Sequence, residues 1–170
     1  MNYDPERHHR RSVRLSGYDY SQGGVYFFTA CTYQRQCLLG SMREGQVEIS
    51  PAGRIVTQTW EGLPDRFPDI ILDEFVVMPN HIHGILVIAD GPIIPETGRE
   101  RPTLGAVLRA FKSLSAVSVN RLLGRTEWPL WQRNYHEKII RSEQMLEAVR
   151  RYVQDNPRCW TDDADNPNNV

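Results

Sequence analysis

Five stretches of the chain are rich in aromatic, aliphatic and β-branched residues, a composition typical of strands. They are residues 23–34, 45–50, 70–78, 81–88 and 130–140. Turn-forming residues interrupt the pattern between them, most clearly at Pro79-Asn80, which separates the third stretch from the fourth. We therefore predict five strands, and we expect the third and fourth to be joined by a turn.

Apolar residues recur at helical spacing in three other segments, and each segment begins with a residue suited to an N-cap. The caps are Ser50, Thr103 and Ser142. Pro64 is expected to end the first helix, and Pro157 the last. With the short strand at 45–50 set aside, the order of elements is β-α-β-β-α-β followed by a helix.

This order predicts an α+β fold of the ferredoxin-like, split βαβ type. We expect an antiparallel sheet with helices on one face and an added C-terminal helix. A chain of 170 residues is long enough for one domain with its own core, so we assign residues 1–170 to a single domain. Within it, 1–14 is predicted to be a basic arm and 161–170 an acidic tail.

The remaining composition excludes several classes of protein. The longest apolar runs fall well short of the roughly 20 residues that a membrane helix needs. The N-terminal residues lack the apolar core of a signal peptide, so we expect a cytoplasmic protein without a membrane partner. The 3 cysteines include no CxxC pair, which argues against a disulfide framework and a cysteine-based zinc site.

A net charge of −1 conceals an uneven distribution. Residues 99–141 contain 9 basic and 3 acidic residues, and residues 1–14 contain 4 arginines against 2 acids. Because arginine predominates and suits phosphate groups, the bias mildly favours nucleic-acid binding, although charged segments of this kind are usually only a solvated surface. The candidate DNA contacts are Arg7, Arg10, Arg11, Arg14, Arg109, Lys112 and Arg133, although any one of them could serve solubility alone.

Two histidines lie one residue apart in an apolar strand, VVMPNHIHGILVI. Side chains on a strand alternate between faces, so His81 and His83 share a face. Either both are buried and satisfied by hydrogen bonds, or they form half of a metal site; the cost of burying two unpaired imidazoles favours the metal. With cysteine poorly supplied, oxygen ligands are expected, and they suit Mg²⁺ or Mn²⁺.

The last helix offers a partner for this site. Met145, Val149, Tyr152 and Asn156 form a narrow stripe at 100° per residue. On this stripe the Tyr152 hydroxyl could lie beside a metal ion while the Asn156 carbonyl oxygen coordinates it. The alternatives are that Tyr152 is an ordinary core residue and that Asn156 only ends the helix.

The motif PNHIHG resembles the His-hydrophobic-His motif of HUH-type single-tyrosine transposases and nickases. Nearly the whole chain is similar to the REP-associated tyrosine transposases, relatives of the insertion-sequence enzymes. The segments that carry this resemblance are RRSVRLSGYDYSQGGVYFFT, LDEFVVMPNHIHGI, TLGAVLRAFKS, LWQRNYHEKIIR and RRYVQDNP. The resemblance implies that His81 and His83 bind metal and that Tyr152 is the nucleophile. Asn156 stands where insertion-sequence relatives use a glutamine as third ligand.

The resemblance also implies a reaction. Tyr152 would attack a phosphate of hairpin-bearing single-stranded DNA, such as a REP-like element, and form a 5′-phosphotyrosine with Mg²⁺ or Mn²⁺ bound. Tyr135, beside His136 and Glu137, is the second candidate for the nucleophile, and the sequence identifies no general base. Two other readings remain: a catalytically silent nucleic-acid-binding protein, and a metal-dependent nuclease in which His81 and His83 activate water. Both monomer and homodimer are compatible with the sequence.

Overall fold

The computed structural model describes residues 23–89 and 101–167 of the chain. The predicted basic arm, with Arg7, Arg10, Arg11 and Arg14, lies outside the described residues. The strands are β1 (Gly24–Cys31), β2 (Gly40–Arg43), β3 (Gln46–Ile49), β4 (Ile70–Val77), β5 (His81–Ile88) and β6 (His136–Ile140). The helices are α1 (Pro51–Glu61), α2 (Leu63–Arg66), α3 (Leu104–Leu122) and α4 (Glu143–Asp155), with short 3-10 helices η1 (Tyr33–Arg35) and η3 (Asn156–Asp162).

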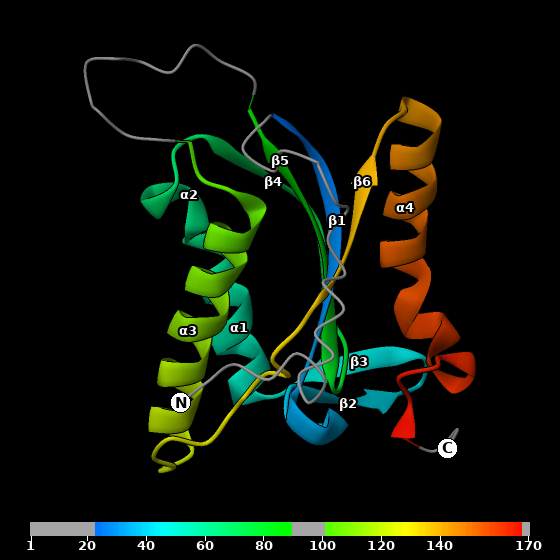
Figure 1. Ribbon diagram of the computed structural model, residues 1–170. Coiled ribbons are helices and arrows are strands. Elements are labelled where there is room, and N and C mark those ends of the chain that lie inside the picture. Colours follow the sequence, from blue (N-terminus) through cyan, green and yellow to red (C-terminus); the bar gives the residue numbers. More distant parts are fainter. Residues whose placement is uncertain (1–22, 90–100, 168–170) are drawn as a thin grey trace, which may run out of the picture.

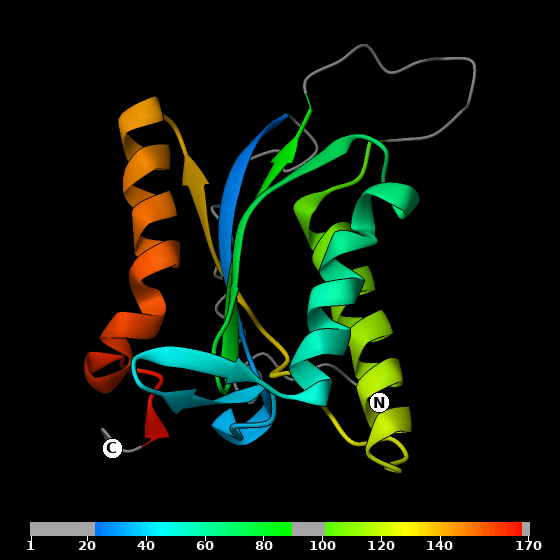
Figure 2. The same cartoon turned by 180° about the vertical axis from the view of Figure 1, so that it is seen from behind.

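Four strands form the main sheet in the order β4-β5-β1-β6, and every neighbouring pair is antiparallel. β5 lies between β1 and β4, the two strands that α1 connects, which is the split βαβ arrangement. α1, α2 and α3 lie on one side of this sheet and α4 on the other (Figures 1 and 2). The predicted fold class is therefore confirmed, with the added helix on the opposite face.

The two faces of the sheet carry separate cores because successive side chains on each strand alternate. On the α1–α3 face, Tyr26 and Phe28 of β1 and Leu86 of β5 are fully buried in the larger apolar cluster. On the α4 face, a smaller cluster consists of Phe27, Ile85, Ile140 and Val153, with Met145 and Val149 packed against it. The histidine-bearing strand thus has apolar residues supporting both of its faces.

Gly84 makes the close packing over β5 possible. A Cβ atom at this position would lie 2.6 Å from the Phe28 ring and 3.3 Å from the Phe75 ring. Both rings belong to the α1–α3 side, so the absence of a side chain at Gly84 lets them cover the strand directly behind His83.

The three predicted N-caps are confirmed: the hydroxyl groups of Ser50, Thr103 and Ser142 each accept a backbone N–H three residues later. The strand predicted at 45–50 is present as β3, and it pairs in a separate hairpin with β2, which was not predicted. Its turn residues, Glu44 and Gly45, both adopt positive φ angles, 52° and 75°. Such angles are required by the two-residue turns that suit antiparallel strands.

One strand boundary differs from its prediction. Only residues 136–140 of the predicted strand 130–140 form a ladder, while Trp131 makes an isolated bridge with Thr32. The predicted helix ends at Pro64 and Pro157 are confirmed, since α1 ends at Glu61 and α4 at Asp155. Each proline occupies the first turn of the short helix that follows, where a proline needs no N–H partner. Among the described residues, no helix is both long enough and apolar enough to span a membrane.

Candidate active site

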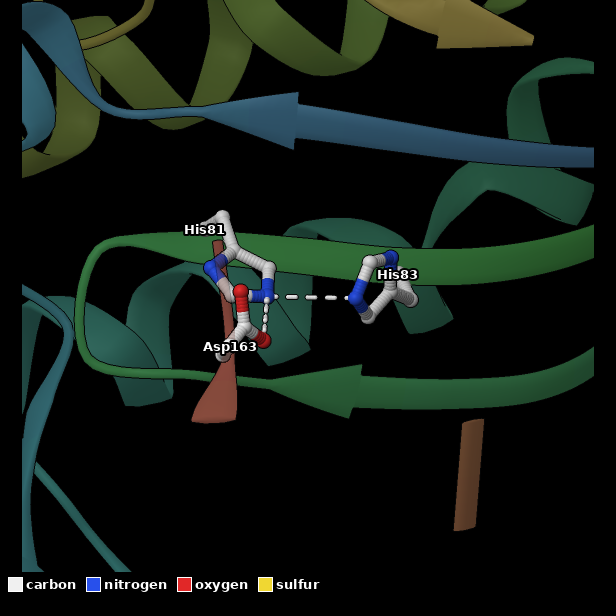
Figure 3. Close-up of side chains that lie close together, drawn as sticks. All are labelled: His81, His83 and Asp163. Carbon is white, nitrogen blue, oxygen red and sulfur yellow. Dashed lines mark hydrogen bonds and ion pairs between the residues drawn. The ribbon is translucent and has the colours of Figure 1, made fainter. Parts of the chain in front are cut away.

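β5 places His81 and His83 side by side on the α4 face of the sheet. Their Nε2 atoms lie 3.1 Å apart, and the residues are 0% and 3% exposed. On the neighbouring strand β1, Cys31 is in register with His81 and Thr29 with His83. The prediction that both imidazoles share one face is confirmed, and they point at a common position (Figure 3).

Asn80 fixes the orientation of the first imidazole. Its side-chain N–H₂ donates to the carbonyl groups of Arg35 and Asp165, at 3.2 and 2.7 Å, so its Oδ1 must face the His81 Nδ1, 2.9 Å away. Since Oδ1 can only accept, His81 Nδ1 carries the proton. The Nε2 atom of neutral His81 is therefore the one with a free electron pair, as a metal ligand requires.

The second imidazole has comparable support. The Thr29 hydroxyl lies 2.8 Å from Nδ1 of His83, and the Phe27 ring stacks on the imidazole at 5.5 Å between centroids. Burial, together with the nearby His81 and His136, lowers the pKa of His83 to about 3. Burial also lowers the pKa of His81, although Asp163 and Asp165 act in the opposite direction. Both side chains are thus held in the neutral form that binds metal.

Tyr152 of α4 reaches this pair from the facing helix. Its hydroxyl lies 3.5 Å from Nε2 of His83, and its ring meets the edge of Phe27 at 5.9 Å. The side chain remains half exposed, at 51%, so a substrate can reach it. Burial and then Asp163 raise the pKa of Tyr152, while the side-chain amide of Asn156 acts to lower it. The phenol is therefore protonated at neutral pH.

Asn156 lies one helical turn beyond Tyr152, at the junction of α4 and η3. The residue is 3% exposed, and its carbonyl oxygen Oδ1 is buried without a hydrogen-bond partner among the residues that the structure describes. A buried acceptor that remains unpaired costs free energy, so its presence needs an explanation, and an unfilled ligand role supplies one. The predicted stripe is thus present: Met145 and Val149 enter the core, and Tyr152 and Asn156 meet the histidines.

Asp163 is the residue that the sequence analysis missed. Its Oδ2 lies 3.8 Å from Nε2 of His81 (Figure 3). The ligand atoms of His81, His83 and Asp163 all lie within 4.8 Å of one another, close enough for one cation to contact all three. Two imidazole nitrogens with oxygen donors from Asp163 and Asn156 make a mixed N and O site that suits a divalent cation.

Residues 161–167, part of the predicted acidic tail, are folded against the site. Arg35 holds them by an ion pair to Asp165 at 3.0 Å and a hydrogen bond to the carbonyl of Ala164 at 2.9 Å. Asn80 adds its bond to the carbonyl of Asp165, so the residue that orients His81 also fixes this turn. The available signal was the density of carboxylates in TDDAD, directly after the helix that carries Tyr152.

The structure does not bring Tyr135 to the histidines. Its ring packs against the core cluster of the α1–α3 face, and the Lys112 ammonium lies 5.9 Å from the ring centroid. Lys112 itself bonds to the carbonyl groups of residues 132, 133 and 134, at 2.6, 3.0 and 3.5 Å. All its donors therefore have protein partners, which gives it a structural role in place of the predicted phosphate contact. Arg109 and Arg133 are exposed nearby.

Comparison with known proteins identifies relatives by sequence and by structure. The chain is 36% identical over 182 residues to an uncharacterized protein of Haemophilus influenzae, covering 95% of each chain. Its fold is similar to that of a REP-associated tyrosine transposase bound to a REP hairpin, with a TM-score of 0.59 and 20% identity over 84% of this chain and 73% of the other. No family model matches. The chain belongs to the family of the Haemophilus influenzae protein and has the fold of the tyrosine transposase.

Proposed function

We propose that this protein is a DNA transposase, a metal-dependent enzyme that cleaves and rejoins hairpin-bearing single-stranded DNA. The proposal rests above all on one relationship: Tyr152 is half exposed, and its hydroxyl lies 3.5 Å from Nε2 of His83. A nucleophile must be accessible to its substrate and close to the group that stabilises the developing charge. Tyr152 meets both conditions, and Tyr135 lies on the other face of the sheet.

The residues around Tyr152 fit a divalent metal ion, Mg²⁺ or Mn²⁺. His81 and His83 would supply nitrogen ligands, and the unpaired Oδ1 of Asn156 and the carboxylate of Asp163 would supply oxygen. When bound, such an ion polarises a phosphate group and offsets the negative charge that develops during its attack. The fit to a divalent ion is supported by the kinds of donor atom present and by the unpaired amide oxygen of Asn156.

The proposed reaction begins with Tyr152. Its oxygen bonds to the scissile phosphorus as the phenolic proton passes to solvent on the exposed side of the ring. The bond from phosphorus to the 3′ oxygen breaks, and that oxygen takes a proton to become a free 3′-OH. Because the 5′-phosphotyrosine keeps the energy of the phosphodiester, the 3′-OH of another strand can reverse the step and join new ends.

The substrate class is suggested by the structural relative, which binds a REP hairpin. Single-stranded DNA exposes both its backbone and its bases, so basic and aromatic side chains can hold it without separating a duplex. Monomer and homodimer both remain compatible with this proposal.

A labelled oligonucleotide tests the proposal directly. The full-length protein is incubated with a REP-type hairpin flanked by single-stranded DNA, labelled at its 3′ end, in the presence of Mn²⁺. We expect a labelled band that migrates with the protein on a denaturing gel, with the adduct mapped by mass spectrometry to the Tyr152 peptide. Tyr152→Phe should abolish the band, and the matched control Tyr135→Phe should retain it.

Two results would overturn the proposed mechanism. Cleavage without an adduct would indicate a nuclease that uses water as its nucleophile. Binding without cleavage, under conditions where the metal is shown to bind, would indicate a catalytically silent nucleic-acid-binding protein.

A further inference from the structure

A second concave site lies away from the histidines, between α3 and the segment 128–135. Its volume is about 390 Å³, within the range of small-ligand pockets. α3 contributes one wall, including Gly105 and Ala116, and residues 128–135 contribute the other. Nothing in the proposed mechanism uses this pocket.

The pocket presents aromatic surface in a fixed arrangement. Trp131 is 6% exposed, and its indole N–H donates to the Ser115 hydroxyl at 2.9 Å, which anchors the wall to α3. Trp128 at the pocket lip is 45% exposed, an unusual position for a large aromatic side chain. The Arg125 guanidinium lies over this ring, 5.9 Å from its centroid.

The second wall is held in place by Lys112. Its ammonium group bonds to three consecutive carbonyl groups, those of residues 132–134, so the segment cannot move away from α3 without losing all three bonds. The pocket is therefore preformed, and binding of a ligand would carry only a small entropic cost for ordering this segment.

Two exposed arginines lie at the rim of the pocket. Arg109 and Arg133 both line the pocket and are exposed, and neither forms an ion pair among the residues that the structure describes. Exposed aromatic surface flanked by exposed guanidinium groups is the combination that binds single-stranded nucleic acid, because bases stack on the rings while phosphates contact the cations.

The pocket also adjoins the candidate active site across one edge of the sheet. Tyr135, which lines the pocket, directly precedes His136 of the edge strand β6. His136 is in register with Thr29, whose hydroxyl contacts His83. A single strand of DNA that passes over the start of β6 can therefore reach both sites.

We propose that this pocket receives one unpaired base of single-stranded DNA, which stacks on Trp128 while Arg109 and Arg133 contact the flanking phosphates. This inference rests on the proposed function, because it supplies a recognition site for the same substrate. It assigns Arg109 and Arg133 to one defined binding site and excludes Lys112 from contact with the DNA.

Binding measurements on the Tyr152→Phe protein, which cannot form an adduct, test this site separately from catalysis. The probe is a fluorescein-labelled hairpin oligonucleotide with a single-stranded flank, and fluorescence anisotropy gives its affinity. We expect Trp128→Ala to weaken binding by about tenfold, in line with the loss of one stacked base. Arg133→Gln should weaken binding and reduce its salt dependence, whereas Arg121→Gln, an exposed arginine of α3 outside the pocket, should do neither.

Two further measurements identify the base. In a series of probes, one base at a time is removed from the single-stranded flank. Removal of the base that enters the pocket should weaken binding to the protein that contains Trp128, and it should not weaken binding to the Trp128→Ala variant. A 5-iodouracil at that position should crosslink to a peptide containing Trp128 or Tyr135. Thermal melts of the variants show that each is folded; a melt like that of the parent is expected for Trp128→Ala because the side chain is half exposed.

The outcomes separate this inference from the proposed function. The base pocket alone would be overturned if the Trp128→Ala and Arg133→Gln variants bind the probe as tightly as the parent while the protein that retains Tyr152 forms the adduct. Pocket-dependent binding without any adduct would support the pocket and overturn the transposase mechanism. No binding of the probe would overturn both.

Discussion

The Oδ2 atom of Asp163 lies 3.8 Å from Nε2 of His81, although 82 positions separate them in the chain. The contact exists because η3 turns back toward β5 after α4, and because Arg35 and Asn80 both bind the residues that follow Asp163. A carboxylate so close to a neutral imidazole can complete the oxygen part of a metal site, and we expect it to contribute to metal affinity.

Replacement of Asp163 by alanine should lower the affinity for Mn²⁺ by about tenfold or more, since a charged ligand is lost. Isothermal titration calorimetry of the full-length protein measures this affinity. Asp162→Ala is the matched control, because Asp162 is the neighbouring carboxylate and is exposed. Unchanged affinity in Asp163→Ala would show that the carboxylate is not a ligand.

Thr29→Val should also weaken metal binding, although Thr29 is not expected to touch the ion. Its hydroxyl fixes the His83 ring through Nδ1 at 2.8 Å, and loss of such a supporting bond typically costs about 10–100-fold in metal affinity. Thr59→Val removes a hydroxyl that bonds only to a helix carbonyl in α1, and it should leave the affinity unaltered. Equal affinities for both variants and the parent would argue against a supporting role for Thr29.

The ion pair between Asp73 and Arg150 joins β4 to α4 and predicts a pH dependence of stability. The Arg150 hydrogen bond lowers the pKa of Asp73 below its ordinary value of 3.8. Folding thus favours the ionised carboxyl of Asp73. The contribution of this carboxyl to the free energy of unfolding is therefore present above the ordinary pKa of 3.8, and it is lost as the pH falls toward the lower pKa of the folded state. The difference in unfolding free energy between the parent and Asp73→Asn should therefore shrink below about pH 4.

Urea denaturation across this pH range measures the effect. Asp69→Asn changes an exposed carboxylate near the start of β4 and is the control. At neutral pH it should lower the free energy of unfolding by less than Asp73→Asn does. A difference for Asp73→Asn that stays constant down to the lowest pH at which the protein is folded would contradict the prediction.

Gly84→Ala should destabilise the protein, because the new methyl group would lie 2.6 Å from the Phe28 ring. Overpacking of this kind costs about 1–3 kcal/mol. Gly62→Ala is the contrasting variant: Gly62 has φ −81°, and its Cβ would lie 3.4 Å from the Gln58 carbonyl oxygen, an ordinary van der Waals contact, so stability should stay equal or rise. Chemical denaturation measures both, and equal stability of Gly84→Ala and the parent would refute the packing argument.

Lys112→Met should lower the free energy of unfolding by about 1–3 kcal/mol, because carbonyl groups of residues 132–134 lose a charged donor. Lys138→Met, at an exposed position of β6, should have little effect. If Lys112 were instead a phosphate contact, its loss would leave stability intact and reduce the salt dependence of DNA binding.

Much of the fold and half of the site were predictable because they depend on local periodicity. Alternation along β5 determines that His81 and His83 share a face, and the turn of α4 determines that Tyr152 and Asn156 share a stripe. N-caps at Ser50, Thr103 and Ser142 are likewise local, since each bond spans three residues. The order of these elements was sufficient to predict the antiparallel sheet.

Tertiary structure alone decided where Asp163 and Tyr135 lie. Asp163 follows a 3-10 helix that contains Pro157, so helical periodicity cannot be extended to it, and its position depends on distant partners in Arg35 and Asn80. Tyr135 precedes a strand that begins only at His136, and the pairing of that strand with β1 turns the ring away from the histidines. Local sequence determines which way a side chain points along its own element, whereas contacts between elements determine what it meets.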